Sequence, residues 1–204
     1  MLQETFLDAL SSYTTDAAIA ATYWKEIEKA YQAKGRHYHT LAHLENLLAQ
    51  LQPYREHCSD WHAVVFATAY HDIVYNVLRH DNEAKSAEFA RKKLDGLSIP
   101  EDRIQLVVNM ILATQKHEQS TIFEINLFTD ADLSVLGASW ETYHTYTQQI
   151  RKEYAIYPDL VYRPGRRKVL EHFLAKNTIY KTRAFVEHVE QQARANLRRE
   201  LNSL

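Results

Sequence analysis

Apolar residues recur at helical spacing along most of the chain, and short polar segments separate them. Residue types that favour helix starts precede these stretches, while Gly96 and Gly137 stand where two of them would end. We predict starts after Thr15-Asp16, Thr40, Ser59-Asp60, Asp81, Ser98 with Pro100 in the first turn, Ser139 and Pro164. Strand-like alternation is confined to residues 120–125, interpreted as a loop over the functional site. The pattern predicts an all-α fold with an amphipathic C-terminal helix, Arg183 through Leu201.

Composition supports this fold class and limits the function. Only four glycines and four prolines interrupt 204 residues, a length that fits one domain, 1–204. Lys plus Arg (24) nearly balances Asp plus Glu (26), so charge gives no indication of nucleic-acid binding. Because no signal peptide or membrane-spanning stretch is visible, we expect a soluble, cytoplasmic protein. Cys58 is the only cysteine, which excludes an internal disulfide and a thiolate zinc site.

Histidines and aspartates form the most informative motifs. His39 and His43 are four residues apart, so on a helix their side chains would share one face. His71-Asp72 ends the apolar stretch 64–70, and a second helix could bring this pair to the same point. Asp130-Ala131-Asp132 offers a further carboxylate. Imidazole and carboxylate groups bind divalent metals, so the pattern predicts a metal site.

A His-Asp dipeptide alone is a weak signal, because this composition gives about half of one by chance. The chain contains two. His80-Asp81 lies in a polar stretch, where Asp81 is interpreted as a helix cap. His71-Asp72 follows an apolar helix that would carry it inward, where it needs a partner. The alternative to a metal site is a buried His–Asp hydrogen bond.

The combined motifs resemble the HD superfamily of metal-dependent phosphohydrolases, and within it a small, poorly characterised bacterial branch of predicted phosphohydrolases. The similarity runs from about Arg36 to the C-terminal helix. It is carried by Arg36–Leu44, His71–Tyr75, Asn82–Ala87 and Asp130–Leu133. The resemblance implies an all-helical HD-type domain with a metal-site core at about residues 36–137 and additional C-terminal helices at 138–204.

The resemblance also implies individual roles. His43, His71-Asp72 and Asp132 would be the metal ligands, and His39 would be the acid that protonates the leaving oxygen. The residue after His39 is Thr40, where the superfamily's cyclic nucleotide phosphodiesterases usually have Asn. Asp132 is preferred over Asp130 because the superfamily places its ligand in an Ala-Asp dipeptide. Asp130 would then support a ligand or cap a helix.

Further residues could complete such a centre, which would hold one or two ions of Mn, Co, Ni, Mg, Fe or Zn. His117 is the candidate ligand for a second metal, and Lys116 could hold a phosphate oxygen. Glu83 is assigned a catalytic role, with His39 and Asp72, as the group that orients water or a ligand imidazole. The alternatives are a solvated helix end for Lys116 and His117, and stabilisation of a helix N-terminus for Glu83.

Cations near the C-terminus are candidate substrate contacts. Arg166 and Arg167 belong to a basic run at the helix predicted after Pro164, and Arg151 could reach the same pocket. A solvated basic turn is the alternative.

The leading functional hypothesis is hydrolysis of a phosphomonoester or phosphodiester of a nucleotide or another small metabolite through metal-activated water. We expect a monomer or homodimer. The alternative is a non-catalytic, metal-containing nucleotide-binding or regulatory module. A di-iron carboxylate oxidase is disfavoured, because the chain has one Glu-x-x-His, Glu141 to His144, instead of two.

Overall fold

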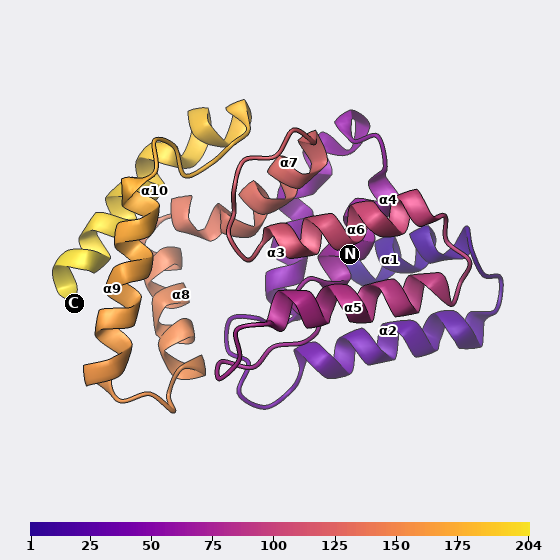
Figure 1. Cartoon of the computed structure of the whole chain (residues 1–204), viewed down its shortest axis with the longest axis horizontal. Coiled ribbons are helices and arrows are strands. Elements are labelled where there is room, and N and C mark those ends of the chain that lie inside the picture. Colours follow the sequence, from indigo (N-terminus) through magenta and orange to yellow (C-terminus); the bar gives the residue numbers. More distant parts are fainter. The chain divides into compact units, whose positions relative to one another are not determined.

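The computed structural model describes all 204 residues and contains helices but no strand (Figure 1), which confirms the all-α prediction. The elements are α1 (Leu2–Ser11), α2 (Ala17–Tyr31), α3 (Leu41–Leu51), the 3-10 helix η1 (Gln52–His57), α4 (Trp61–Tyr70), α5 (Asn82–Asp95), α6 (Glu101–Ala113), α7 (Phe123–Asp132), the 3-10 helix η2 (Leu133–Gly137), α8 (Trp140–Glu153), α9 (Asp159–Ala175) and α10 (Arg183–Ser203). No helix has both the length and the apolar composition needed to cross a bilayer.

Backbone contacts divide the chain into two compact units, Met1–Thr129 and Asp130–Leu204. The division falls inside α7, so this helix begins in one unit and ends in the other. The expected division between a metal-site core and C-terminal helices, at residues 137 and 138, therefore differs from the structural one by about two helical turns. Whether the chain acts as one domain stays a prediction.

The N-terminal unit is organised around α4. All residues from Ala63 to Tyr70 are buried, and α4 packs against α1, α3, α5 and α6. A helix that is apolar on all sides belongs in a core. The Phe6 ring of α1 lies 5.9 Å from the Phe66 ring and 6.0 Å from the Tyr70 ring, in edge-on contacts. This packing fixes the C-terminal end of α4, where His71 follows.

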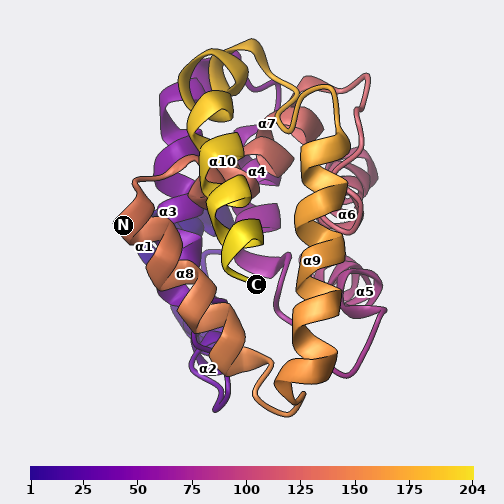
Figure 2. The same cartoon turned by 90° about the vertical axis from the view of Figure 1, so that its left-hand side faces the viewer.

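The C-terminal unit is organised around α10, which packs against α9 and η2 and is seen in front of α8 and α9 in the view of Figure 2. Glu200 of α10 accepts hydrogen bonds from Nε and Nη2 of Arg166 at 2.7 and 2.8 Å, and from the Tyr143 hydroxyl of α8. Asn196 donates to the carbonyl oxygens of Leu136 and Ala138, both at 2.8 Å. Because these polar groups are buried and paired, they hold the three helices in one arrangement.

Most predicted helix starts are confirmed. Asp16, Asp60 and Ser139 are N-cap residues whose side chains accept hydrogen bonds from backbone N–H groups. Asp81 occupies the N-cap of α5 without such a bond, because its carboxylate pairs with Arg79.

Two predictions of local structure are wrong. Pro164 does not begin a helix: α9 starts at Asp159, and Pro164 lies inside it. The helix tolerates Pro164 because the carbonyl that loses its partner belongs to the exposed Leu160 and can bond to water. Residues 120–125 are only partly a loop, since α7 begins at Phe123. Exposed Phe123 and buried Ile125 are two residues apart, so they would share one face of a strand but lie on opposite sides of a helix, and the helix accounts for their different exposure.

Candidate metal centre

His43 lies in the first turn of α3 and is buried, with 5% of its surface exposed. Its neighbours on the inner face, Leu44 and Leu47, belong to the core and fix the helix. The sequence therefore places one imidazole at the edge of the apolar interior, where a polar group needs a partner.

His71 directly follows α4 and is 1% exposed. Its Nδ1 lies 3.1 Å from the carbonyl oxygen of Thr68, which can only accept, so Nδ1 carries the proton and the lone pair is on Nε2. The Phe128 ring packs against the imidazole at 5.8 Å. A backbone contact that fixes the tautomer in this way is common for metal-binding histidines.

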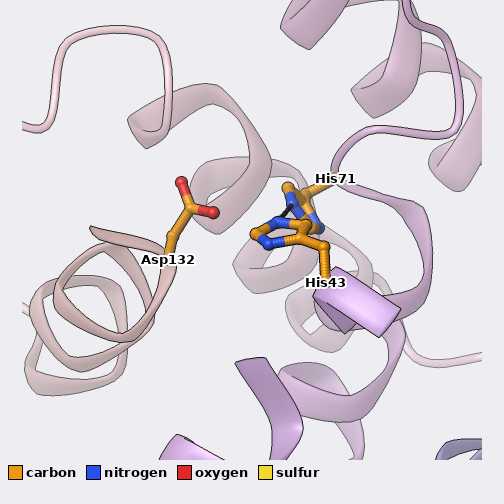
Figure 3. A group of neighbouring side chains, drawn as sticks. All are labelled: His43, His71 and Asp132. Atoms are coloured by element: carbon orange, nitrogen blue, oxygen red, sulfur yellow. Dashed lines mark hydrogen bonds between the residues drawn. The ribbon is translucent and has the colours of Figure 1, made fainter. Parts of the chain in front are cut away.

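The two imidazoles face each other, with their Nε2 atoms 3.1 Å apart. Asp132, the last residue of α7, directs its carboxylate toward them (Figure 3). One ligand atom from each of His43, His71 and Asp132 lies within 4.8 Å of the others, so this group could hold a metal ion.

Asp72 lies beside the same atoms. Its Oδ2 is 3.2 Å from Nε2 of His71 and 4.0 Å from Nε2 of His43. Two ligands about 2.1 Å from one ion, at the angles found in tetrahedral or octahedral sites, are separated by about 3.0–3.4 Å. The separations of the His71 Nε2 from the other two atoms, 3.1 and 3.2 Å, both lie in this range, whereas the 4.0 Å between Nε2 of His43 and Oδ2 of Asp72 is wider. The donor set and its geometry therefore fit a divalent ion with mixed nitrogen and oxygen ligands.

His39 does not share a helix face with His43, contrary to the prediction. It precedes Thr40, the N-cap of α3, so it lies outside the helix and its four-residue spacing from His43 does not place the two side chains on one face. Its Nε2 nevertheless lies 3.8 Å from Oδ2 of Asp72, and its ring contacts the Tyr75 ring in a tilted arrangement, with the ring centres 4.3 Å apart. The loop brings His39 to Asp72 as a neighbour of the cluster, in keeping with a role distinct from that of His43.

Asp130 has other partners. Its fully buried carboxylate accepts hydrogen bonds from the backbone N–H and Nζ of Lys181 and from the backbone N–H and hydroxyl of Thr182. Thr182 is the N-cap of α10, so Asp130 holds the start of that helix against the end of α7. This contact supports the interpretation of Asp130 as a capping residue rather than a metal ligand.

The remaining candidates of the N-terminal unit lie at helix ends. Glu83 is in the first turn of α5, where a carboxylate interacts favourably with the helix dipole. Lys116 and His117 follow α6, and His117 has a left-handed backbone with φ of 51°. A catalytic role for Glu83 and a phosphate or second-metal role for Lys116 and His117 stay predictions.

The cations proposed for substrate binding differ in their surroundings. Arg151 pairs with Asp159 at 2.8 Å and donates to two backbone carbonyls. Arg166 is buried and paired with Glu200, a position the sequence could not indicate because its partner lies 34 residues away. Arg167 is exposed. Since the helix starts earlier than predicted, Arg166 and Arg167 lie within α9 and not at its N-terminus, which removes the backbone argument for anion binding.

Sequence reasoning assigned no role to Tyr31 and Arg36, which contact the backbone around the site. The Tyr31 hydroxyl accepts from the N–H of Asp72, and Arg36 donates to the carbonyl oxygens of His39 and Ile73. No periodicity or spacing reveals such contacts, because they join side chains to distant backbone.

Comparison of the chain with protein-family models, with curated proteins and with solved structures found no match. The resemblance to the HD superfamily therefore depends on the motif residues alone.

Proposed function

We propose that this protein is a metal-dependent phosphohydrolase of the HD type that cleaves a phosphomonoester or phosphodiester of a nucleotide or another small metabolite. The single observation that carries the proposal is the facing pair of His43 and His71, with Asp72 and Asp132 beside it. Two neutral imidazoles and two carboxylates compensate the charge of a divalent cation and leave its remaining positions open.

A bound divalent ion would lower the pKa of a water molecule toward about 7 and would neutralise charge on the phosphoryl group. The protein's own residues would complete the reaction. Water adds to phosphorus, the ester P–O bond breaks, and the leaving oxygen needs a proton. His39 is suited to donate it, because an imidazole can serve as a general acid and its Nε2 lies 3.8 Å from Oδ2 of Asp72, beside the proposed metal ligands.

The ring of His39 is held for this role. The Tyr75 ring contacts it in a tilted arrangement at 4.3 Å, and the Tyr38 ring approaches edge-on at 5.0 Å. The side chain keeps 19% of its surface exposed, so it can meet a substrate and exchange its proton with solvent. A group that is restrained but accessible suits general acid catalysis.

The test uses purified protein loaded with Mn²⁺ and two probes, p-nitrophenyl phosphate and bis-p-nitrophenyl phosphate. Asp72→Ala should abolish both hydrolysis and high-affinity Mn²⁺ binding. The chain offers a matched control in Asp81→Ala, since Asp81 also follows a histidine but pairs with Arg79 at the surface. Asp81→Ala should retain activity.

His39→Gln separates acid catalysis from metal binding. It should bind Mn²⁺ like the wild type but hydrolyse about 100-fold to 10,000-fold more slowly, the usual range for loss of a general acid. Folded, Mn²⁺-loaded protein that binds nucleotides without turning over any member of a phosphoester panel would support the alternative, a regulatory module, and refute the proposal.

A further inference from the structure

Arg36 contacts both loops that carry residues of the candidate metal centre. Its Nη1 donates to the carbonyl oxygen of His39 at 3.1 Å, and its Nη2 donates to the carbonyl oxygen of Ile73 at 3.1 Å. His39 precedes α3, and Ile73 follows α4. Helical hydrogen bonding therefore fixes neither of the two carbonyls that Arg36 joins.

Aromatic rings hold the guanidinium in place. Its central carbon lies 4.7 Å from the ring centre of Tyr31 and 5.3 Å from that of Tyr75. Tyr31 is 1% exposed, and its hydroxyl accepts from the backbone N–H of Asp72 at 3.1 Å. The Tyr75 ring contacts the His39 ring at 4.3 Å. The rings beside Arg36 thus contact Asp72, a proposed metal ligand, and His39, the proposed acid.

We infer that Arg36 is a positioning residue that clamps the His39 loop to the turn after α4 and thereby holds Asp72 in place to bind metal. This inference rests on the proposed function. It requires the guanidinium itself, because a planar fork with two separate donor nitrogens reaches two carbonyls at once while keeping ring contact. A lysine at this position would keep the charge but offer a single ammonium, so it could bond to only one loop at full strength.

Arg36→Lys tests the clamp, with Arg103→Lys as the matched control. Arg103 belongs to the same unit, also lies over a tyrosine ring (Tyr13, 5.6 Å) and bonds to Asp60 instead of to either site loop. Amide hydrogen exchange of the metal-free protein measures how firmly the loops are held. Calorimetric titration with Mn²⁺ measures the consequence for the site.

Arg36→Lys should accelerate exchange about tenfold or more in residues 36–40 and 71–75, and should weaken Mn²⁺ binding by about tenfold, typical for loss of a residue that orients a ligand. Arg103→Lys should change neither. Tyr31→Phe, which removes only the hydroxyl, should accelerate exchange at the Asp72 amide and leave residues 36–40 unchanged.

Wild-type exchange rates in Arg36→Lys would overturn the clamp. Faster exchange with an unchanged Mn²⁺ affinity would overturn the positioning role, since Arg36 would then serve stability alone. A wild-type protein that binds no Mn²⁺ would refute the proposed function and the metal role together. In that case exchange alone decides whether Arg36 holds the loops: acceleration supports the clamp, and unchanged rates overturn it.

Discussion

Asp130 and Asp132 are two residues apart in α7, yet the structure predicts opposite consequences for their replacement by asparagine. Asp130 is fully buried and is paired with the ammonium group of Lys181, whose side chain is 5% exposed. Both carboxylate oxygens accept hydrogen bonds, so an amide must turn an NH₂ group toward donors. Breaking one side of a buried ion pair costs about 3–5 kcal/mol. At about 2–4 °C per kcal/mol for a chain of this length, Asp130→Asn should lower Tm by roughly 6–20 °C.

Asp132→Asn removes a proposed ligand at a partly exposed position. It should weaken Mn²⁺ binding at least about 100-fold, which is more than the loss of affinity when a residue that only orients a ligand is replaced. It should lower Tm of the metal-free protein by no more than a few degrees. Thermal unfolding and calorimetric titration of both variants give the comparison. If Asp130→Asn keeps wild-type stability and loses the metal, the assignment of the two carboxylates is reversed and the reasoning fails.

Three further predictions concern stability and reactivity. Arg166→Gln should lower the free energy of unfolding by about 3–5 kcal/mol, because it removes the cation paired with the buried carboxylate of Glu200. Replacement of the exposed Arg167 by glutamine should change it by less than about 0.5 kcal/mol, and equal effects of the two variants in denaturant titrations would contradict this. Burial, with Glu124 nearby, raises the pKa of the Cys58 thiol to about 11, so iodoacetamide at pH 8 should label the folded protein about 100-fold more slowly than the denatured chain; similar rates would refute the assigned burial. Burial raises the pKa of Glu124, but hydrogen bonds from Ser59 outweigh it and the net pKa is lowered, so this pairing stabilises the fold above the unfolded pKa of about 4.3 and is lost as pH falls through the lower folded value. Glu124→Gln should therefore cost about 1–3 kcal/mol at pH 7 and progressively less below about pH 4, and an equal cost at pH 3 and pH 7 would contradict the linkage.

Local chemistry explains which structural features could be predicted. Asp60 and Ser139 are N-cap residues whose side chains bond to N–H groups within three residues, so their pattern is complete in the sequence. The apolar run before His71 indicated a buried helix for the same reason. The helix start predicted at Pro164 was wrong, because α9 packs against α10 and such tertiary contacts can outweigh a local preference.

The site was predictable in its residue types and less so in its geometry. His43, His71 and Asp132 are brought together as expected, and Asp72 lies beside them. The expected helical relation of His39 to His43 was wrong, because α3 begins at Leu41, at the start predicted after Thr40, and His39 therefore lies outside the helix. Arg36 belongs to a motif of the resemblance but was assigned no role, because its partners are backbone carbonyls, one of them 37 residues away.

The central claim is that His43, His71, Asp72 and Asp132 bind one divalent ion. Crystals grown with MnCl₂, measured near the manganese absorption edge, would test it most directly. The account predicts an anomalous peak about 2.0–2.3 Å from Nε2 of both histidines and from a carboxylate oxygen of each aspartate. Crystals with ordered Mn²⁺ elsewhere and ordinary hydrogen-bonded imidazoles at this position would contradict it.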